Sequence, residues 1–192
     1  MEILIGLIVV VIVIAVILAI WLISAYNGLI RKKNNAEEAW SGIHTQERSR
    51  LDTIEQLMGS VKGYTKHENE ISMAFASARG ALNDAQNGDV KNLEKAQQSM
   101  DQAMVNIQAV SEAYPDLKAN ENFLQLQDEI TRLERQIAAA RRRYNNSVQE
   151  FNTTRQSFPT NIIAGMIGFK EDFEYFEFDE EVARVAPTVD FS

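Results

Sequence analysis

The stretch WLISAYNGLIRKKNNAEEAW, Trp21–Trp40, joins two very different kinds of sequence. The run Ile3–Ile23, which ends within this stretch, contains no charged or strongly polar side chain. At 1.5 Å per residue this run makes a helix of roughly 31 Å, about the thickness of the hydrocarbon core of a bilayer. A signal peptide has a shorter apolar region, about 7–15 residues, after a basic start, whereas this run follows Glu2. The run therefore predicts a retained transmembrane helix.

The residues just after the span predict its orientation. Arg31, Lys32 and Lys33 lie within ten residues of the end of the apolar run. Lys and Arg close to a span stay on the cytoplasmic side of the membrane. We therefore expect a single-pass protein with its N-terminus outside and its C-terminal domain in the cytoplasm. A sequence without cysteine agrees with a reducing compartment.

The charge balance bears on the class of partner. The formal net charge is −8, whereas nucleic-acid-binding proteins show a basic stripe or patch. Nucleic acid is therefore not an expected partner. Only the cluster of Arg31, Lys32 and Lys33 suits an anionic lipid surface.

Beyond the span, apolar residues recur at helical spacing in four segments. The first segment runs from Leu29 to Tyr64 and has one polar residue, Glu47, on its apolar seam. The later stripes are Ile71–Ala85, Leu93–Val110 and Phe123–Phe158, separated by NGD at Asn87–Asp89 and by Pro115, and ended by Pro159. Short connections favour antiparallel neighbours.

The predicted fold is therefore all-α. It consists of an N-terminal transmembrane helix followed by an antiparallel up-and-down four-helix bundle with long outer helices and an irregular C-terminal tail. We divide the chain into an anchor at 1–25, a cytoplasmic helical bundle at 26–159, and an apolar segment with an acidic, aromatic tail at 160–192.

Two C-terminal segments are candidate interaction surfaces. NIIAGMIGF (Asn161–Phe169) has no charge, and the predicted topology places it near the bilayer. It would dip into the interface, cover the open end of the bundle, or seal a contact between protomers. The acidic tail that follows opposes burial against anionic lipid, so we favour the contact between protomers, made by Ile162, Ile163, Met166, Ile167 and Phe169.

The tail EDFEYFEFDEE (Glu171–Glu181) alternates acidic and aromatic residues. Its aromatics, Phe173, Tyr175, Phe176 and Phe178, either anchor the tail to the bundle or form a strip for a partner. The tail could also meet Arg31–Lys33 of a neighbouring copy. Within the span, Ala15 and Ala19 form a small-xxx-small pair that permits close packing of helices.

No motif for catalysis or cofactor binding stands out. His44 and His67 lack the spacing of metal ligands, and no nucleophile motif or phosphate loop is present. His44 could reach Glu47 one turn along the helix, which more often means a surface hydrogen bond than a pair of metal ligands. Adjacent residues on a helix point different ways, so Arg141–Arg143 are expected to form no single patch. They are interpreted as solvated side chains that pair with acidic neighbours, or as part of a docking surface for an acidic partner. We expect no catalytic residue, no metal, no cofactor and no small-molecule substrate.

Several segments occur in the order and spacing of the LemA family, which this chain resembles over nearly its whole length. They are YNGLIRKKNNAEEAWSGI, VKGYTKHE, AYPDLKANENFLQLQDEI, ARRRYNNSVQEFN, and FPTNIIAGMIGF followed by EYF. The resemblance implies a single-pass protein of the bacterial inner membrane with a cytoplasmic four-helix domain, and no enzyme activity. It also suggests HtpX-type membrane metalloproteases or TPM-domain proteins as partners.

The chain departs from the family pattern in its first helix. It has Glu47 in place of a seam leucine, Ser49 with Arg50 in place of a basic pair, and Ile54 followed by Glu55 in place of an Ile-Pro turn. A less kinked helix and a polar contact near Glu47 are expected. Two functional hypotheses remain, a scaffold that forms homo-oligomers by lateral assembly at the membrane and an adaptor or regulator of a membrane protease.

Overall fold

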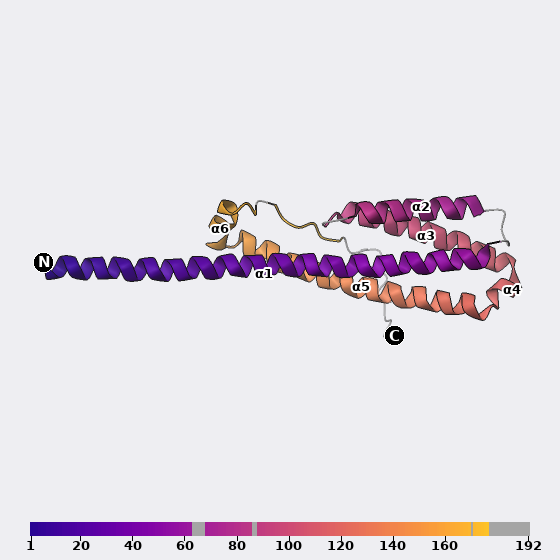
Figure 1. The fold of residues 1–192 in the computed structure, drawn as a ribbon, viewed down its shortest axis with the longest axis horizontal. Helices are drawn as coiled ribbons and strands as arrows, with labels where there is room; N and C mark the ends of the chain where they lie inside the picture. Colours follow the sequence, from indigo (N-terminus) through magenta and orange to yellow (C-terminus); the bar gives the residue numbers. More distant parts are fainter. Residues whose placement is uncertain (63–67, 86–87, 170, 177–192) are drawn as a thin grey trace, which may run out of the picture.

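The structure, a computed structural model, describes residues 1–62, 68–85, 88–169 and 171–176. Across these residues it contains helices and no strand, which confirms the all-α prediction. In chain order the helices are α1 (Glu2–Val61), α2 (Glu68–Asp84), α3 (Val90–Ala113), α4 (Pro115–Lys118), α5 (Glu121–Gln156) and α6 (Thr160–Met166). Figure 1 shows that α1, α2, α3 and α5 reverse direction in turn, with the short α4 at one end and α6 at the other.

The long helix α1 is the axis of the molecule. It contains 60 residues, which corresponds to about 90 Å. Within the described part of the chain it is the one helix long and apolar enough to cross a membrane. Its side chains from Ile3 to Ile23 are exposed, and a buried face begins at Leu29. The apolar run and the first helix of the domain are therefore one unbroken helix.

Local capping chemistry sets the starts of α3 and α5. The side chain of Asp89 accepts a hydrogen bond from the backbone N–H of Asn92 at 3.0 Å. Gly88, just before it, has φ of 88°, a left-handed conformation that favours glycine. The side chain of Asn120 likewise accepts from the N–H of Phe123 at 3.2 Å. These bonds satisfy donors that the first turn of a helix leaves without partners.

At its C-terminal end α5 is shorter than the apolar spacing predicts. The predicted stripe includes Phe158, but the helix ends at Gln156 and Phe158 is 80% exposed. Pro159 is the physical reason, because proline disfavours a helical backbone at the residue before it. Phe158 therefore leaves the core stripe and stands at the start of the α6 segment.

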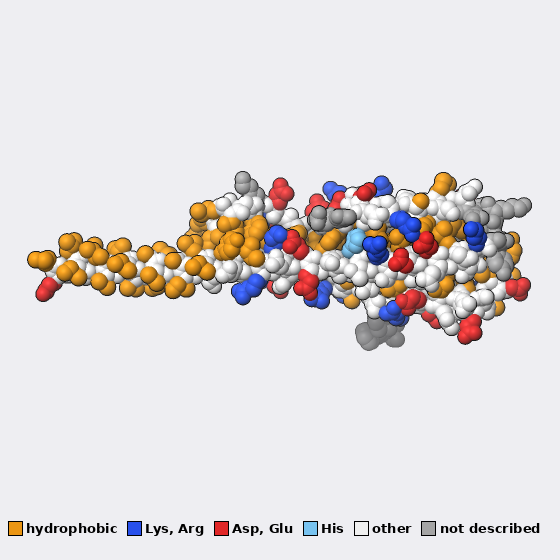
Figure 2. Space-filling view, in the orientation of Figure 1, with side chains coloured by type: hydrophobic (Ala, Val, Ile, Leu, Met, Phe, Trp, Pro, Cys, Tyr) orange, Lys and Arg blue, Asp and Glu red, His pale blue; other side chains and the backbone are white. Residues whose placement is uncertain are grey.

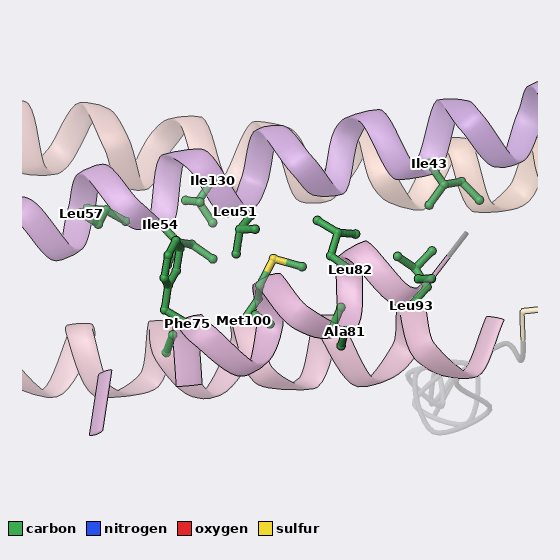
Figure 3. Packing of buried hydrophobic residues seen from close by; sticks show 14 of the residues in the cluster. Ile43, Leu51, Ile54, Leu57, Phe75, Ala81, Leu82, Leu93, Met100 and Ile130 are labelled. Atoms are coloured by element: carbon green, nitrogen blue, oxygen red, sulfur yellow. The ribbon is translucent and has the colours of Figure 1, made fainter. Parts of the chain in front are cut away.

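The core lies where α1 meets α5 on one side and the α2–α3 hairpin on the other. Figure 3 shows side chains from all four helices converging there, with Ile54, Phe75, Met100 and Ile130 as examples. A second, smaller cluster joins Leu29 of α1 to Phe151 of α5 and Ala164 of α6. This second cluster fixes α6 beside the stretch of α1 that follows the apolar run.

Candidate interaction surface

Residues 171–176, called the C-terminal strap below, run back from α6 along α5 (Figure 1). Two asparagines of α5 bind the backbone of the strap. The amide of Asn152 donates to the carbonyl of Phe173 at 3.0 Å and accepts from its N–H at 3.1 Å. Asn145 makes the same pair of bonds to Phe176, at 2.9 and 3.0 Å. Each side-chain amide thus makes the pair of hydrogen bonds that the backbone of a neighbouring β-strand would make.

The spacing of the two asparagines matches an extended chain. Asn145 and Asn152 are seven residues apart on a helix, which is about 10.5 Å along its axis. Phe173 and Phe176 are three residues apart, which is roughly 10 Å in an extended chain. The lower-numbered asparagine binds the higher-numbered phenylalanine, so the strap runs antiparallel to α5. Only an extended segment can satisfy both amides together.

Phe176 fills an aromatic pocket between α1 and α5. It is 3% exposed and stacks on Trp40 with ring centroids 5.8 Å apart. Tyr144 meets the same ring edge-on at 5.5 Å. The guanidinium of Arg141 lies 5.4 Å from the ring centroid, in the range of a cation–π contact.

The start of the strap is held by a charged contact and by a second aromatic group. Arg155 donates to Asp172 at 2.9 Å, and Gln156 donates to the same carboxylate at 2.8 Å. The ring of Phe173 packs edge-on against Phe151 at 5.1 Å. Of the two readings of the aromatic tail, anchoring to the bundle therefore describes Phe173 and Phe176. Tyr175, between them, is 45% exposed.

Helix α6 has an inner and an outer face. Ile163 and Ala164 are buried against the bundle, and Phe169 packs on the second cluster. The exposed apolar residues of α6 and of its two flanks, called the α6 face below, are Phe158, Ile162, Met166 and Ile167, at 80%, 56%, 82% and 36% exposed. The sequence prediction grouped Ile162, Ile163, Met166, Ile167 and Phe169 as one contact set, whereas the structure divides them between these two faces.

A buried polar cluster lies farther along α1. Glu47 is fully buried and accepts a short hydrogen bond from Gln97 of α3. Arg141 of α5 lies 3.9 Å from the same carboxylate oxygen. Arg50, one turn along α1, binds Asp101 at 2.6 Å and Glu134 at 3.0 Å. The seam position that interrupts the apolar pattern therefore has polar partners on two other helices.

Burial changes the proton affinity of two groups here. Burial raises the pKa of the Glu47 carboxyl above its ordinary value, and the hydrogen bond from Gln97 and the charges of Arg50 and Arg141 oppose that rise. Burial, with a smaller contribution from the negative charge of Glu174, raises the pKa of the Tyr144 phenol to about 12. The Tyr144 hydroxyl therefore stays protonated and donates to the carbonyl of Glu174 at 3.0 Å.

The predicted contact between His44 and Glu47 is wrong. The Nε2 atom of His44 lies 2.9 Å from the carbonyl oxygen of Leu82 on α2, because Glu47 points into the core while His44 faces the α2–α3 hairpin. Of the three consecutive arginines, Arg141 and Arg143 point different ways, as predicted for adjacent residues on a helix. Arg143 pairs with the exposed Glu38 at 3.3 Å, and Arg141 turns inward, so they form no single patch.

The remaining predicted residues lie along α1 or at the end of the chain. Lys32 pairs with Glu150 at 3.0 Å, Lys33 pairs with Glu37, and Arg31 is exposed. Ala15 and Ala19 are exposed on the apolar rod. Phe178 lies outside the described residues, as does His67.

Sequence reasoning missed the roles of Asn145 and Asn152. Both are nearly buried, at 6% and 5% exposed. A signal was present, because each stands beside an aromatic residue of the core stripe, at Tyr144 and Phe151, with the same spacing of seven. Polar residues at core positions of a helix need a partner, and here that partner is the backbone of the strap.

Comparison with known proteins places the chain in a family. A family model described as LemA family matches residues 39–191, a region that includes most of the bundle, α6 and the strap. Protein LemA of Metamycoplasma hominis is 33% identical over 139 residues, which cover 72% of this chain and 63% of that protein. The match thus spans less than two thirds of the relative. Neither the family description nor the name of the relative states an activity.

Proposed function

The chain belongs to the LemA family, and from that premise we propose that it is a non-enzymatic scaffold, anchored in a membrane by α1, whose copies assemble laterally. The observation that carries the proposal is the continuity of α1. One helix contains both the stretch long and apolar enough to cross a membrane and the central helix of the bundle. The membrane anchor and the bundle therefore move as one body.

This continuity supports lateral assembly. The buried face of α1 begins at Leu29, six residues after Ile23, and continues to Val61. The bundle is thus held at a fixed height and with a fixed face relative to the anchor. Copies in one membrane present the same surfaces to each other at the same level, as symmetric association requires. Confinement to the membrane also raises their effective concentration, so weak contacts suffice.

The basic residues that follow the span support a cytoplasmic bundle and, for a bacterial protein, the inner membrane. Arg31, Lys32 and Lys33 all lie within ten residues of Ile23, and Lys and Arg near a span favour the cytoplasmic side. The ion pairs of Lys32 with Glu150 and of Lys33 with Glu37 hold two of these cations next to the bundle. The N-terminus then lies on the opposite side of the membrane.

The arrangement of the charged side chains supports a role without chemistry. Glu47, whose pKa is raised by burial, would be the natural proton donor or acceptor of a helical-bundle enzyme. Its side chain is 0% exposed and is bound to Gln97, so a substrate in solution does not reach it. Arg50 is likewise 8% exposed and paired with Asp101 and Glu134.

The test is the mass of the full-length protein in detergent, measured by light scattering beside a variant that begins at Tyr26. We expect a defined multiple of the monomer mass for the full-length protein. Replacing Ala15 and Ala19 by isoleucine tests the helix contact in the span, with Val9 and Val16 replaced by isoleucine as the control. A monomeric full-length protein would refute lateral assembly, and a stoichiometric membrane protease copurifying with that monomer would favour the adaptor hypothesis.

A further inference from the structure

The α6 face lies at the level where a membrane ends. Leu29, which packs against Ala164 of α6, is six residues past Ile23, about 9 Å along the helix axis. A bilayer has a hydrocarbon core of about 30 Å and a full thickness of about 40–45 Å, which leaves roughly 5–8 Å of headgroup region on each side. When Ile3–Ile23 spans the core, α6 therefore lies at the boundary between headgroups and water.

The aromatic residues of α1 mark the same boundary. Trp21 and Tyr26 stand on either side of the end of the apolar run and are 37% and 44% exposed. Trp and Tyr favour the membrane–water interface, because each has an apolar ring and a polar group. Figure 2 shows the hydrophobic surface of the rod continuing, at this level, into hydrophobic surface over α6.

The chemistry of the α6 segment suits the interface. Residues Ser157–Phe169 carry no charge, and Ile162 and Met166 are one helical turn apart, so they point to the same side. The nearby carboxylate of Asp172 is bound to Arg155 and Gln156, which reduces its repulsion of anionic headgroups. Arg31 is exposed and close to the same level of α1, where a cation meets lipid phosphates.

From this continuity we infer that the α6 face inserts into the interfacial layer of the bilayer, so that the protein contacts lipid at a second place besides its span. The partner is a phospholipid surface, with its headgroup and glycerol region against Ile162 and Met166 and with phosphates near Arg31. This differs from the contact between protomers that the sequence favoured, and the reason is the height at which the second cluster holds α6. It also goes beyond the scaffold role, because it requires no second copy.

The natural absence of cysteine allows a direct test in the full chain. Single Met166→Cys and Ile162→Cys variants are labelled with a nitroxide and reconstituted in vesicles of phosphatidylethanolamine and phosphatidylglycerol. Collisions of the label with oxygen, which concentrates in lipid, are compared with collisions with a water-soluble nickel chelate. Met73→Cys, on α2 and 66% exposed in the native chain, is the control for water, and Ile12→Cys is the control for the middle of the span.

We expect the labels at 166 and 162 to collide with nickel several-fold less often, and with oxygen more often, than the label at 73. A nickel collision rate equal to that of Met73→Cys would place the α6 face in water and overturn the inference. Protection from both reagents would mean contact with another protein surface and would also overturn it. Assembly through other surfaces leaves these values unchanged, so the result is independent of the scaffold proposal.

Discussion

Replacing Asn145 by alanine should release the end of the C-terminal strap. The change removes two hydrogen bonds, of 2.9 and 3.0 Å, to the backbone of Phe176. Each bond contributes about 1 kcal/mol, and a buried backbone group left without a partner costs about 1–3 kcal/mol. The released strap can form hydrogen bonds with water, which offsets part of this cost. We therefore expect the free energy of docking of the strap on α5 to weaken by about 2–4 kcal/mol. That corresponds to a roughly 30- to 1,000-fold change in its equilibrium.

The assay is amide hydrogen exchange of the strap in the full-length protein, because the Phe176 N–H is protected only while it donates to Asn145. Asn146→Ala is the matched control, since Asn146 is the next residue on the same helix and is exposed. Both changes gain similar helix propensity, so only the contact to the strap distinguishes them. Equal exchange of residues 173–176 in the two variants would refute the proposal that Asn145 holds the strap.

Three further predictions concern the core and the charges. Folding raises the pKa of the Glu47 carboxyl, so the contribution of this group to the free energy of unfolding is lost as pH rises from about 4.5 through the folded pKa. The unfolding free energy of Glu47→Gln should therefore increase relative to that of the native chain over this pH range. Urea unfolding at several pH values checks this, and a difference independent of pH would contradict it. Ile54→Ala, at a fully buried site, should cost about 2–5 kcal/mol of unfolding free energy, whereas Val105→Ala, 62% exposed, should change it by less than about 0.5 kcal/mol. Lys32→Ala removes a partly exposed pair with Glu150 and should cost less than about 1 kcal/mol, with a smaller effect at high salt; a loss above about 2 kcal/mol would be inconsistent with that exposure.

The periodic helices were the most predictable part of the fold. Residues such as Ile43, Ile54 and Leu57 repeat at helical spacing and are all buried, because one face of each helix must leave water. The turn at Gly88 and Asp89 was also predictable from the sequence. Glycine favours the left-handed backbone conformation of Gly88, and aspartate favours the N-cap position that Asp89 takes in α3. Local rules therefore sufficed where the decisive contacts are close in sequence.

The long-range polar contacts were not predictable in the same way. Nothing near Asn145 in sequence indicates that its partner is the backbone of Phe176, 31 residues away. The direction of Arg141, toward Glu47 and Phe176, depends on how α5 is rotated against α1. The division of α6 into two faces likewise depends on Leu29 and Phe151 in other helices. These features follow from packing, which a single sequence does not specify directly.

The unbroken α1 also makes the molecule a lever. From Ile23 to Val61 the helix extends 38 residues, roughly 57 Å, beyond the apolar run. A span that is long for its bilayer adjusts by tilting. A tilt of about 10° at the membrane then moves the far end of α1 roughly 10 Å sideways, taking the α2–α3 hairpin with it. Under the proposed membrane anchoring, a small change in bilayer thickness would move the tip of the bundle far enough to bring together or separate surfaces there.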